Sequence, residues 1–271
     1  MRLMAFTFSL SRRPTVAVIR LQGTIAAGGR GGLSDASLAP VITRAFAKKP
    51  VAVALAVNSP GGSPVQSALI AARIRRLAEE KHVPVHAFVE DVAASGGYWL
   101  ATAGDDIWAD ESSLLGSIGV IHASFGFPEF IHRHGIERRV LTAGRSKSLA
   151  DPFRSMTEAD EQRIRALLEP IHGNFIRHVE MRRGARLASG VDLFQGDVWV
   201  GQQAVALGLA DGIGHLVPRM KAVYGDKIRF RAFGPKRSLL SRLGVQALGA
   251  EVLAGMEGAA EERALWARYG L

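Results

Sequence analysis

One serine, Ser95, lies in the stretch EDVAASGGYWLATAGD (residues 90–105), with two alanines before it and two glycines after it. These small neighbours leave the hydroxyl accessible, and Gly96 and Gly97 allow backbone amides to approach a group bound to it. An apolar, helix-like run follows, so the serine is expected at a helix N-terminus, where the helix dipole favours negative charge. The pattern suits an exposed nucleophile, although a crowded turn would need the same small residues.

A second glycine-rich turn, NSPGGSP at residues 58–64, also follows an apolar strand. Functional sites of parallel α/β sheets gather beyond the carboxyl ends of the strands, so the two turns are expected side by side. Amides of Gly61 and Gly62 facing the hydroxyl of Ser95 would have the layout of an oxyanion hole for acyl transfer. Either glycine pair alone predicts only a tight turn.

A serine hydroxyl needs a base to act as a nucleophile at neutral pH, and the sequence leaves two candidates open. Lys147 lies in the loop TAGRSKSLADPF, and His122 lies near the end of the expected strand GSIGVIHAS. A free lysine has a pKa of ~10.4 and can accept a proton only where burial lowers that value by several units. Leu149, Phe153 and Ile118 are the apolar neighbours expected to provide such an environment.

The patterns of several other hydrolases are absent from the sequence. No lysine follows a serine by three residues, and G-x-S-x-G fails at Ser95 because Ala93 stands at its first position. The eight histidines form no H-E-x-x-H pair, which argues against a zinc protease. The chain has no cysteine, which excludes disulfides, thiolate nucleophiles and cysteine-ligated metals.

Hydrophobic patterning predicts an α/β fold in which a mainly parallel sheet is surrounded by helices. The continuous apolar run at residues 51–58 is typical of a central strand covered on both faces. The other expected strands are 15–22, 83–90, 105–110, 116–123 and 136–143, and the expected helices are 64–81, 126–135, 157–183 and 199–208.

The 271 residues carry a net charge of +9, supplied mostly by scattered arginines, and no nucleic-acid partner is expected. The first residues, MRLMAFTFSLSRRP, are too short and polar for a membrane span, which takes ~20 apolar residues, and no signal peptide is expected. Residues 236–271 are expected to form a helical tail or an oligomerisation arm. Basic residues beside its apolar face leave contact with a membrane surface as a second option.

Five blocks of the sequence, in this order, resemble the signal peptide peptidase A family of serine proteases. They are NSPGGSPVQSALIAARI, VEDVAASGGYWLATAGDDIWAD, LLGSIGVI, GRSKSLADPFRSMTEADEQRI and DVWVGQQAVALGLADGIG. The resemblance implies a Clp protease/crotonase-like peptidase domain over residues 1–235 that needs no cofactor or metal. It also implies peptide substrates, a homo-oligomeric ring, and a cytoplasmic location with peripheral contact at the inner membrane as an option.

By position, the resemblance implies that Ser95 is the nucleophile and Lys147 the general base of a Ser/Lys dyad, 52 positions apart. The remaining implied roles are Ser117 holding the lysine amine, Gly62 and Gly96 forming the oxyanion hole, and Asn58 and Gly61 shaping its turn.

Three departures from the family are expected. Many members begin with a membrane-spanning helix, which is not expected here, and many bacterial members carry two homologous halves, where one is expected here. The lysine block is also a looser version of the family's, with Ser148 and Leu149. A single half favours assembly from several subunits. The function predicted is a serine endopeptidase that cleaves unstructured apolar peptides, such as released signal peptides. The alternatives are a Clp-type protease with His122 as base, a crotonase-like acyl-CoA enzyme, and a scaffold without catalysis.

Overall fold

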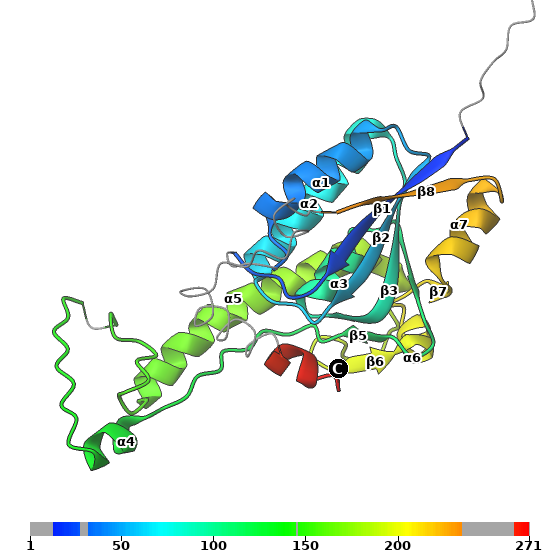
Figure 1. The fold of residues 1–271 in the computed structure, drawn as a ribbon. Helices are drawn as coiled ribbons and strands as arrows, with labels where there is room; N and C mark the ends of the chain where they lie inside the picture. Colours follow the sequence, from blue (N-terminus) through cyan, green and yellow to red (C-terminus); the bar gives the residue numbers. More distant parts are fainter. Residues whose placement is uncertain (1–12, 28–31, 145, 235–262, 271) are drawn as a thin grey trace, which may run out of the picture.

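The computed structural model describes residues 13–27, 32–144, 146–234 and 263–270, and Figure 1 shows a single twisted sheet with helices on both faces. The sheet has the order β6-β5-β3-β2-β1-β8, and β4 pairs with β3 and β7. All pairings are parallel except that of β5 with β6, so the predicted mainly parallel α/β fold is confirmed. The strands are β1 (Thr15–Gln22), β2 (Ala52–Ser59), β3 (Val85–Ala94), β4 (Asp106–Ala109), β5 (Leu114–Gly116), β6 (Val198–Val200), β7 (Gly212–Ile213) and β8 (Arg229–Phe233).

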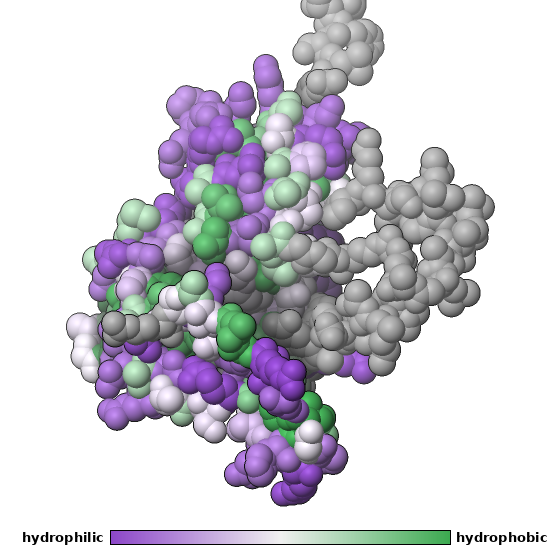
Figure 2. Space-filling view, turned by 90° about the vertical axis from the view of Figure 1, so that its left-hand side faces the viewer, coloured by the Kyte–Doolittle hydropathy of each residue, from purple (hydrophilic) through white to green (hydrophobic). Residues whose placement is uncertain are grey.

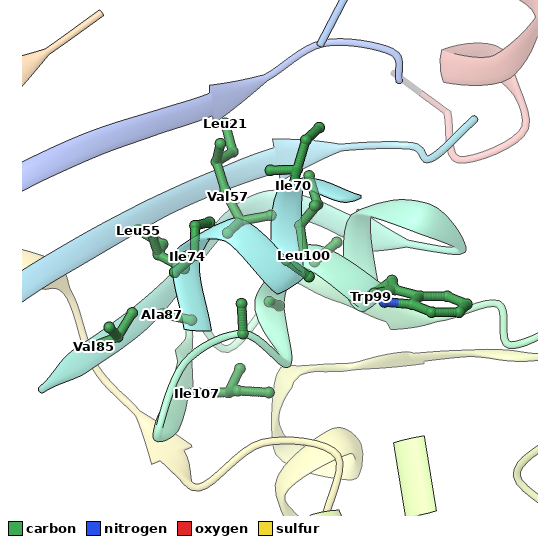
Figure 3. Packing of buried hydrophobic residues seen from close by; sticks show 14 of the residues in the cluster. Leu21, Leu55, Val57, Ile70, Ile74, Val85, Ala87, Trp99, Leu100 and Ile107 are labelled. Atoms are coloured by element: carbon green, nitrogen blue, oxygen red, sulfur yellow. The ribbon is translucent and has the colours of Figure 1, made fainter. Parts of the chain in front are cut away.

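The strand β2 is the centre of the sheet and is buried along its whole length, as its continuous apolar run predicts. On one face, α1 (Asp35–Ala47), α2 (Pro64–Lys81) and α3 (Gly96–Ala101) bury the larger core, where Ile70 and Ile74 of α2 lie over Leu55 and Val57 of β2 (Figure 3). On the other face, α7 (Leu216–Tyr224) covers a smaller cluster. The central strand β2 therefore lies between two layers of helices, one on each face of the sheet.

The helix ends follow from local sequence. Ser63 caps α2 by accepting the Gln66 N–H, and Pro64 occupies the first turn, where its missing N–H has no cost. Thr157 and Asp160 form a reciprocal capping box at the start of α5 (Glu158–Arg183). These two helices match the predicted bounds. The shorter α6 (Gly201–Ala206) and a 3₁₀ turn (Gly184–Arg186) complete the body.

Residues 120–156, here called the arm, leave the body as an extended loop that carries the short helix α4 (Pro128–Arg133) (Figure 1). The strands predicted at 116–123 and 136–143 are wrong: β5 ends at Gly116, and residues 136–142 form no strand. A strand needs a neighbouring backbone for its hydrogen bonds, and no strand of the described chain pairs with this stretch. The apolar side chains of the second stretch, Ile136, Val140 and Leu141, are exposed.

The predicted helical tail or oligomerisation arm at 236–271 falls largely outside the described residues and stays a prediction. Residues 263–267 are helical. Within the described ranges, none of the helices has the length and apolar character required to cross a membrane.

Candidate active site

The two glycine turns predicted to lie side by side are in contact. A Cβ added to Gly61 would lie 2.8 Å from the Cβ of Ser95, and the φ of Gly61 is +105°. A Cβ added to Gly62, with φ of +139°, would collide with the carbonyl oxygen of Ile25. Because only glycine tolerates both the positive φ and the lack of space, these residues allow the end of β2 to approach Ser95.

Ser95 lies at the junction of β3 and α3, in a backbone conformation that non-glycine residues rarely adopt, with φ of +53° and ψ of −124°. Its N–H donates to the carbonyl oxygen of Gly116 over 2.8 Å, which ties the junction to β5. The side chain is half-buried and forms no capping hydrogen bond to α3. The hydroxyl is therefore held in place by a strained backbone and is not used by the helix.

A cavity of about 340 Å³ opens over Ser95. The implied site residues Gly62, Gly96 and Ser117 line it. Its apolar walls are Trp99 on α3, Ile171 and Phe175 on α5, and Val120 and Ile121 at the base of the arm. The other lining residues are Pro60, Pro64, Gly119, Gln195, Gly196, Leu265, Arg268 and Tyr269.

Two backbone amides lie close together beside the hydroxyl. Within the described residues, the Gly62 N–H donates to no protein acceptor. Gly96 is the first residue of α3, and the first N–H groups of a helix have no intrahelical acceptor. A Cβ added to Gly96 would lie 3.4 Å from the Gly62 nitrogen, so both amides belong to one small region. Paired free donors next to a hydroxyl suit an oxyanion that forms on a bound carbonyl.

Asn58 and Ser117 brace the site from either side. The Asn58 side-chain amide donates to the Asp91 carboxylate over 2.5 Å, and its oxygen accepts the Val92 N–H over 3.2 Å, so β2 is tied to a bulge of β3. Ser117 has a φ of +50°, and its N–H donates to the Asp197 carbonyl over 2.6 Å. Asn58 thus faces β3, whereas Ser117 lines the cavity.

A stack of rings that the sequence analysis missed supports the apolar wall. Trp99 lies 5.0 Å from Phe175 and 4.4 Å from His178, measured between ring centroids. Burial, helped by the positive charge of Arg182, lowers the pKa of His178 to about 4, so the ring is neutral and stacks without a charge. The helical spacing of Ile171, Phe175 and His178, which places them on one face of α5, was the sequence signal that could have predicted this wall.

Neither candidate base lines the cavity. Lys147 is exposed on the arm, and His122 is exposed in the chain that follows β5. The apolar neighbours expected around the lysine are separated: Ile118 is fully buried in the body, while Phe153 is 37% exposed on the arm. The structure therefore brings Ser95 together with Ser117, Gly62, Gly96 and Gly61, and it leaves Lys147 outside this group.

A second polar cluster lies away from the cavity. His86 pairs with Asp106 and Tyr224, each over 2.8 Å, near the start of β3, whereas Ser95 follows the end of the same strand. This cluster links β3, β4 and α7, and it is too far along the strand to serve Ser95. Among the described residues, no group of His, Asp and Glu could hold a metal ion.

A match to the model of peptidase family S49 covers residues 77–222, which include β3, Ser95, the arm and the whole of α5. The chain belongs to peptidase family S49. This membership agrees with the resemblance seen in the sequence, and the fold is the mainly parallel α/β fold that the sequence predicts.

Relatives include a protein named Na(+)/H(+) antiporter NhaA from Brucella melitensis, 48% identical over 94% of this chain and 37% of the relative. Probable protease SohB from Haemophilus influenzae is 31% identical over 74% of this chain and 56% of the relative. The chain thus spans about a third to a half of their lengths. A solved structure, a variant of the 1510-N membrane-bound stomatin-specific protease in complex with a substrate peptide, matches with a TM-score of 0.46 and 13% identity over 85% of this chain and 96% of the other.

Proposed function

We propose that this chain is a serine endopeptidase in which Ser95 attacks the peptide bond. One observation carries the proposal. The Ser95 backbone has a positive φ, its hydroxyl forms no capping hydrogen bond to α3, and the amides of Gly62 and Gly96 lie beside it in the same cavity. Membership of peptidase family S49 supports the same reaction class.

In the proposed mechanism, Ser95 Oγ forms a bond to the carbonyl carbon while its proton passes to a neutral Lys147 amine. The carbonyl oxygen becomes an oxyanion that accepts hydrogen bonds from the Gly62 and Gly96 amides. Lys147 then gives the proton to the leaving amine as the peptide bond breaks, and water hydrolyses the ester on Ser95 by the same route. Ser117, which lines the cavity, is the residue proposed to hold the lysine amine.

The lysine reaches this cavity from a second copy of the chain in the proposed enzyme. Lys147 lies on the arm, where many large apolar side chains are exposed. Figure 2 shows hydrophobic patches between hydrophilic ones on the side of α4. Such exposed apolar surface marks an interface. Burial there would also lower the pKa of a lysine, as a base requires. The large exposed apolar residues of the arm are Ile121, Phe125, Phe127, Phe130, Ile136, Val140, Leu141, Phe153 and Met156.

The substrates proposed are unstructured peptides with large apolar side chains, including released signal peptides. The walls formed by Trp99, Ile171 and Phe175 favour apolar groups, and a volume of about 340 Å³ accommodates a large side chain. We place the enzyme in the cytoplasm, with the inner-membrane surface as a second location where such peptides arise.

The decisive experiment mixes two inactive variants. Ser95→Ala and Lys147→Ala should each reduce cleavage of a fluorogenic apolar peptide by about a thousandfold or more, because each removes one half of the dyad. Dissociating and reassembling the two proteins together should restore part of the activity, since some sites then combine an intact serine with an intact lysine. Activity that is retained in Lys147→Ala would contradict the dyad, and a mixture that stays inactive would contradict the contribution from a second copy.

Two further measurements separate the alternatives. If His122 were the base, His122→Ala would be the inactive variant and Lys147→Ala would remain active. A crotonase-like acyl-CoA enzyme would not need the Ser95 hydroxyl, so a fluorophosphonate probe that labels the wild type and not Ser95→Ala would argue against it. A scaffold without catalysis would fold normally and give no labelling.

A further inference from the structure

The short segment 263–270 lies over the Ser95 cavity. Residues 263–267 form a helical turn that continues through the hydrogen bond from the Tyr269 N–H to the Trp266 carbonyl, 2.9 Å long. Leu265, Arg268 and Tyr269 line the same cavity as Ser95. Figure 1 draws the segment in red beside β5 and β6, the strands that flank the site.

The segment presents one face to the body. Leu265 and Tyr269, one helical turn apart, are half-buried, whereas Arg263, Ala264 and Ala267 are exposed. Tyr269 also lines a second cavity, of about 690 Å³, to which Leu114 of β5 contributes, so this side chain takes part in two cavities of the body. A helix of this length is unstable in isolation, and its position therefore depends on these contacts.

The chemistry of the contact matches the substrates proposed above. Leu265 and Tyr269 offer a large aliphatic and a large aromatic side chain to the cavity that holds Trp99 and Phe175. A peptide substrate with apolar side chains would bury the same wall. The segment and the substrate therefore compete for one surface.

We infer that the segment 263–270 is a built-in competitor that covers Ser95 and must move aside before a peptide binds. The inference rests on the proposed peptidase function. If the segment covers the cavity for about nine-tenths of the time, the apparent affinity for any other occupant is about tenfold weaker, because only the open fraction binds.

The first test is the rate at which a fluorophosphonate probe labels Ser95. The double variant Leu265→Ala/Tyr269→Ala should be labelled about tenfold faster than the wild type. Arg263→Ala, on the exposed face of the same turn, is the matched control and should be labelled at the wild-type rate. A synthetic peptide with the sequence of residues 263–270 should slow the labelling of the double variant. Equal rates in all three proteins would overturn the inference.

A second test reads access to the cavity without any catalysis. The chain has no cysteine, so Ser95→Cys places a single thiol in the cavity. A bulky maleimide should modify this thiol about tenfold faster when Leu265→Ala and Tyr269→Ala are also present. Equal modification would overturn the inference. Absence of fluorophosphonate labelling from every serine-containing protein would instead refute the proposed function, and the thiol experiment would still decide whether the segment covers the cavity.

Discussion

The surroundings of Ser95 and the arm that carries Lys147 are built in opposite ways. Gly61 packs so closely against Ser95 that a Cβ added to the glycine would collide with the serine side chain, and the adjoining residues of α3 are buried. On the arm, a Cβ added to Gly144 would meet nothing within 4 Å, and Leu141 is 100% exposed. The difference teaches that one half of the proposed dyad is fixed by the core of this chain, while the other half lacks the packing that would fix it.

The largest expected effect on stability contrasts a buried with an exposed ion pair. Arg183 is 3% exposed, lies 2.7 Å from Asp211 and donates to the Gly208 carbonyl. Arg183→Met should lower the free energy of unfolding by about 3–5 kcal/mol, because it leaves the partly buried Asp211 carboxylate with less compensation. Arg139→Ala, which breaks the exposed pair with Glu137 on the arm, should leave the urea midpoint unchanged. Equal losses would show that the arm is as tightly packed as the body.

A pair of glycines isolates the effect of close packing. Gly61 and Gly144 have nearly the same φ, +105° and +100°, but only Gly61 faces other atoms. Gly144→Ala should cost about 1 kcal/mol through backbone strain alone, whereas Gly61→Ala adds a collision with Ser95 and should cost about 3 kcal/mol. Thermal unfolding of both variants measures the difference. A cost for Gly144→Ala as large as that for Gly61→Ala would mean that the arm is packed in solution against something else.

The ring stack beneath the cavity predicts a dependence of stability on pH. The unfolded chain protonates His178 near pH 6.5, but burial lowers its pKa in the folded protein to about 4. Between these values the unfolded state binds more protons, so the free energy of unfolding should fall by about 2–3 kcal/mol as the pH drops through this window. His178→Gln should remove this dependence of the free energy of unfolding on pH, and His134→Gln, on the arm, should leave it intact. Unfolding curves at pH 7, 5.5 and 4 provide the measurement, and identical slopes for the two variants would contradict the assignment.

The smallest effect on stability is expected at the apolar surface of the arm. Leu141→Ser should leave the free energy of unfolding of a single chain within about 0.5 kcal/mol, because the side chain touches little of its own chain. It should nevertheless weaken assembly and peptide cleavage together, measured by light scattering and by turnover at the same concentrations. A fully assembled and active Leu141→Ser protein would place the interface elsewhere.

The sequence predicts the body of this protein well because its elements are specified locally. The apolar run of β2, the cap and proline of α2, and the capping box of α5 each act over a few residues, and all three elements appear near the expected bounds. The small residues around Ser95 and Gly61 likewise indicated a close approach of two turns. Each of these signals is contained in a short stretch of sequence.

The arm and the walls of the cavity escaped prediction because they depend on distant contacts. The β-branched residues Ile136 and Val140 favoured a strand, but no strand of the described chain lies beside this stretch, and its apolar side chains are exposed. Trp99 meets His178 across 79 positions, and residues 265–269 reach Ser95 from far along the sequence. Periodicity identifies which side of a helix is apolar but not what lies against it.

The positive φ of Ser95 lowers the thermal stability of the protein at the residue that carries the proposed nucleophilic hydroxyl. A glycine at this position would relax the backbone, so Ser95→Gly is expected to melt at a higher temperature than the parent while losing its hydroxyl. The fold thus tolerates a small loss of stability at Ser95, the residue proposed as the nucleophile.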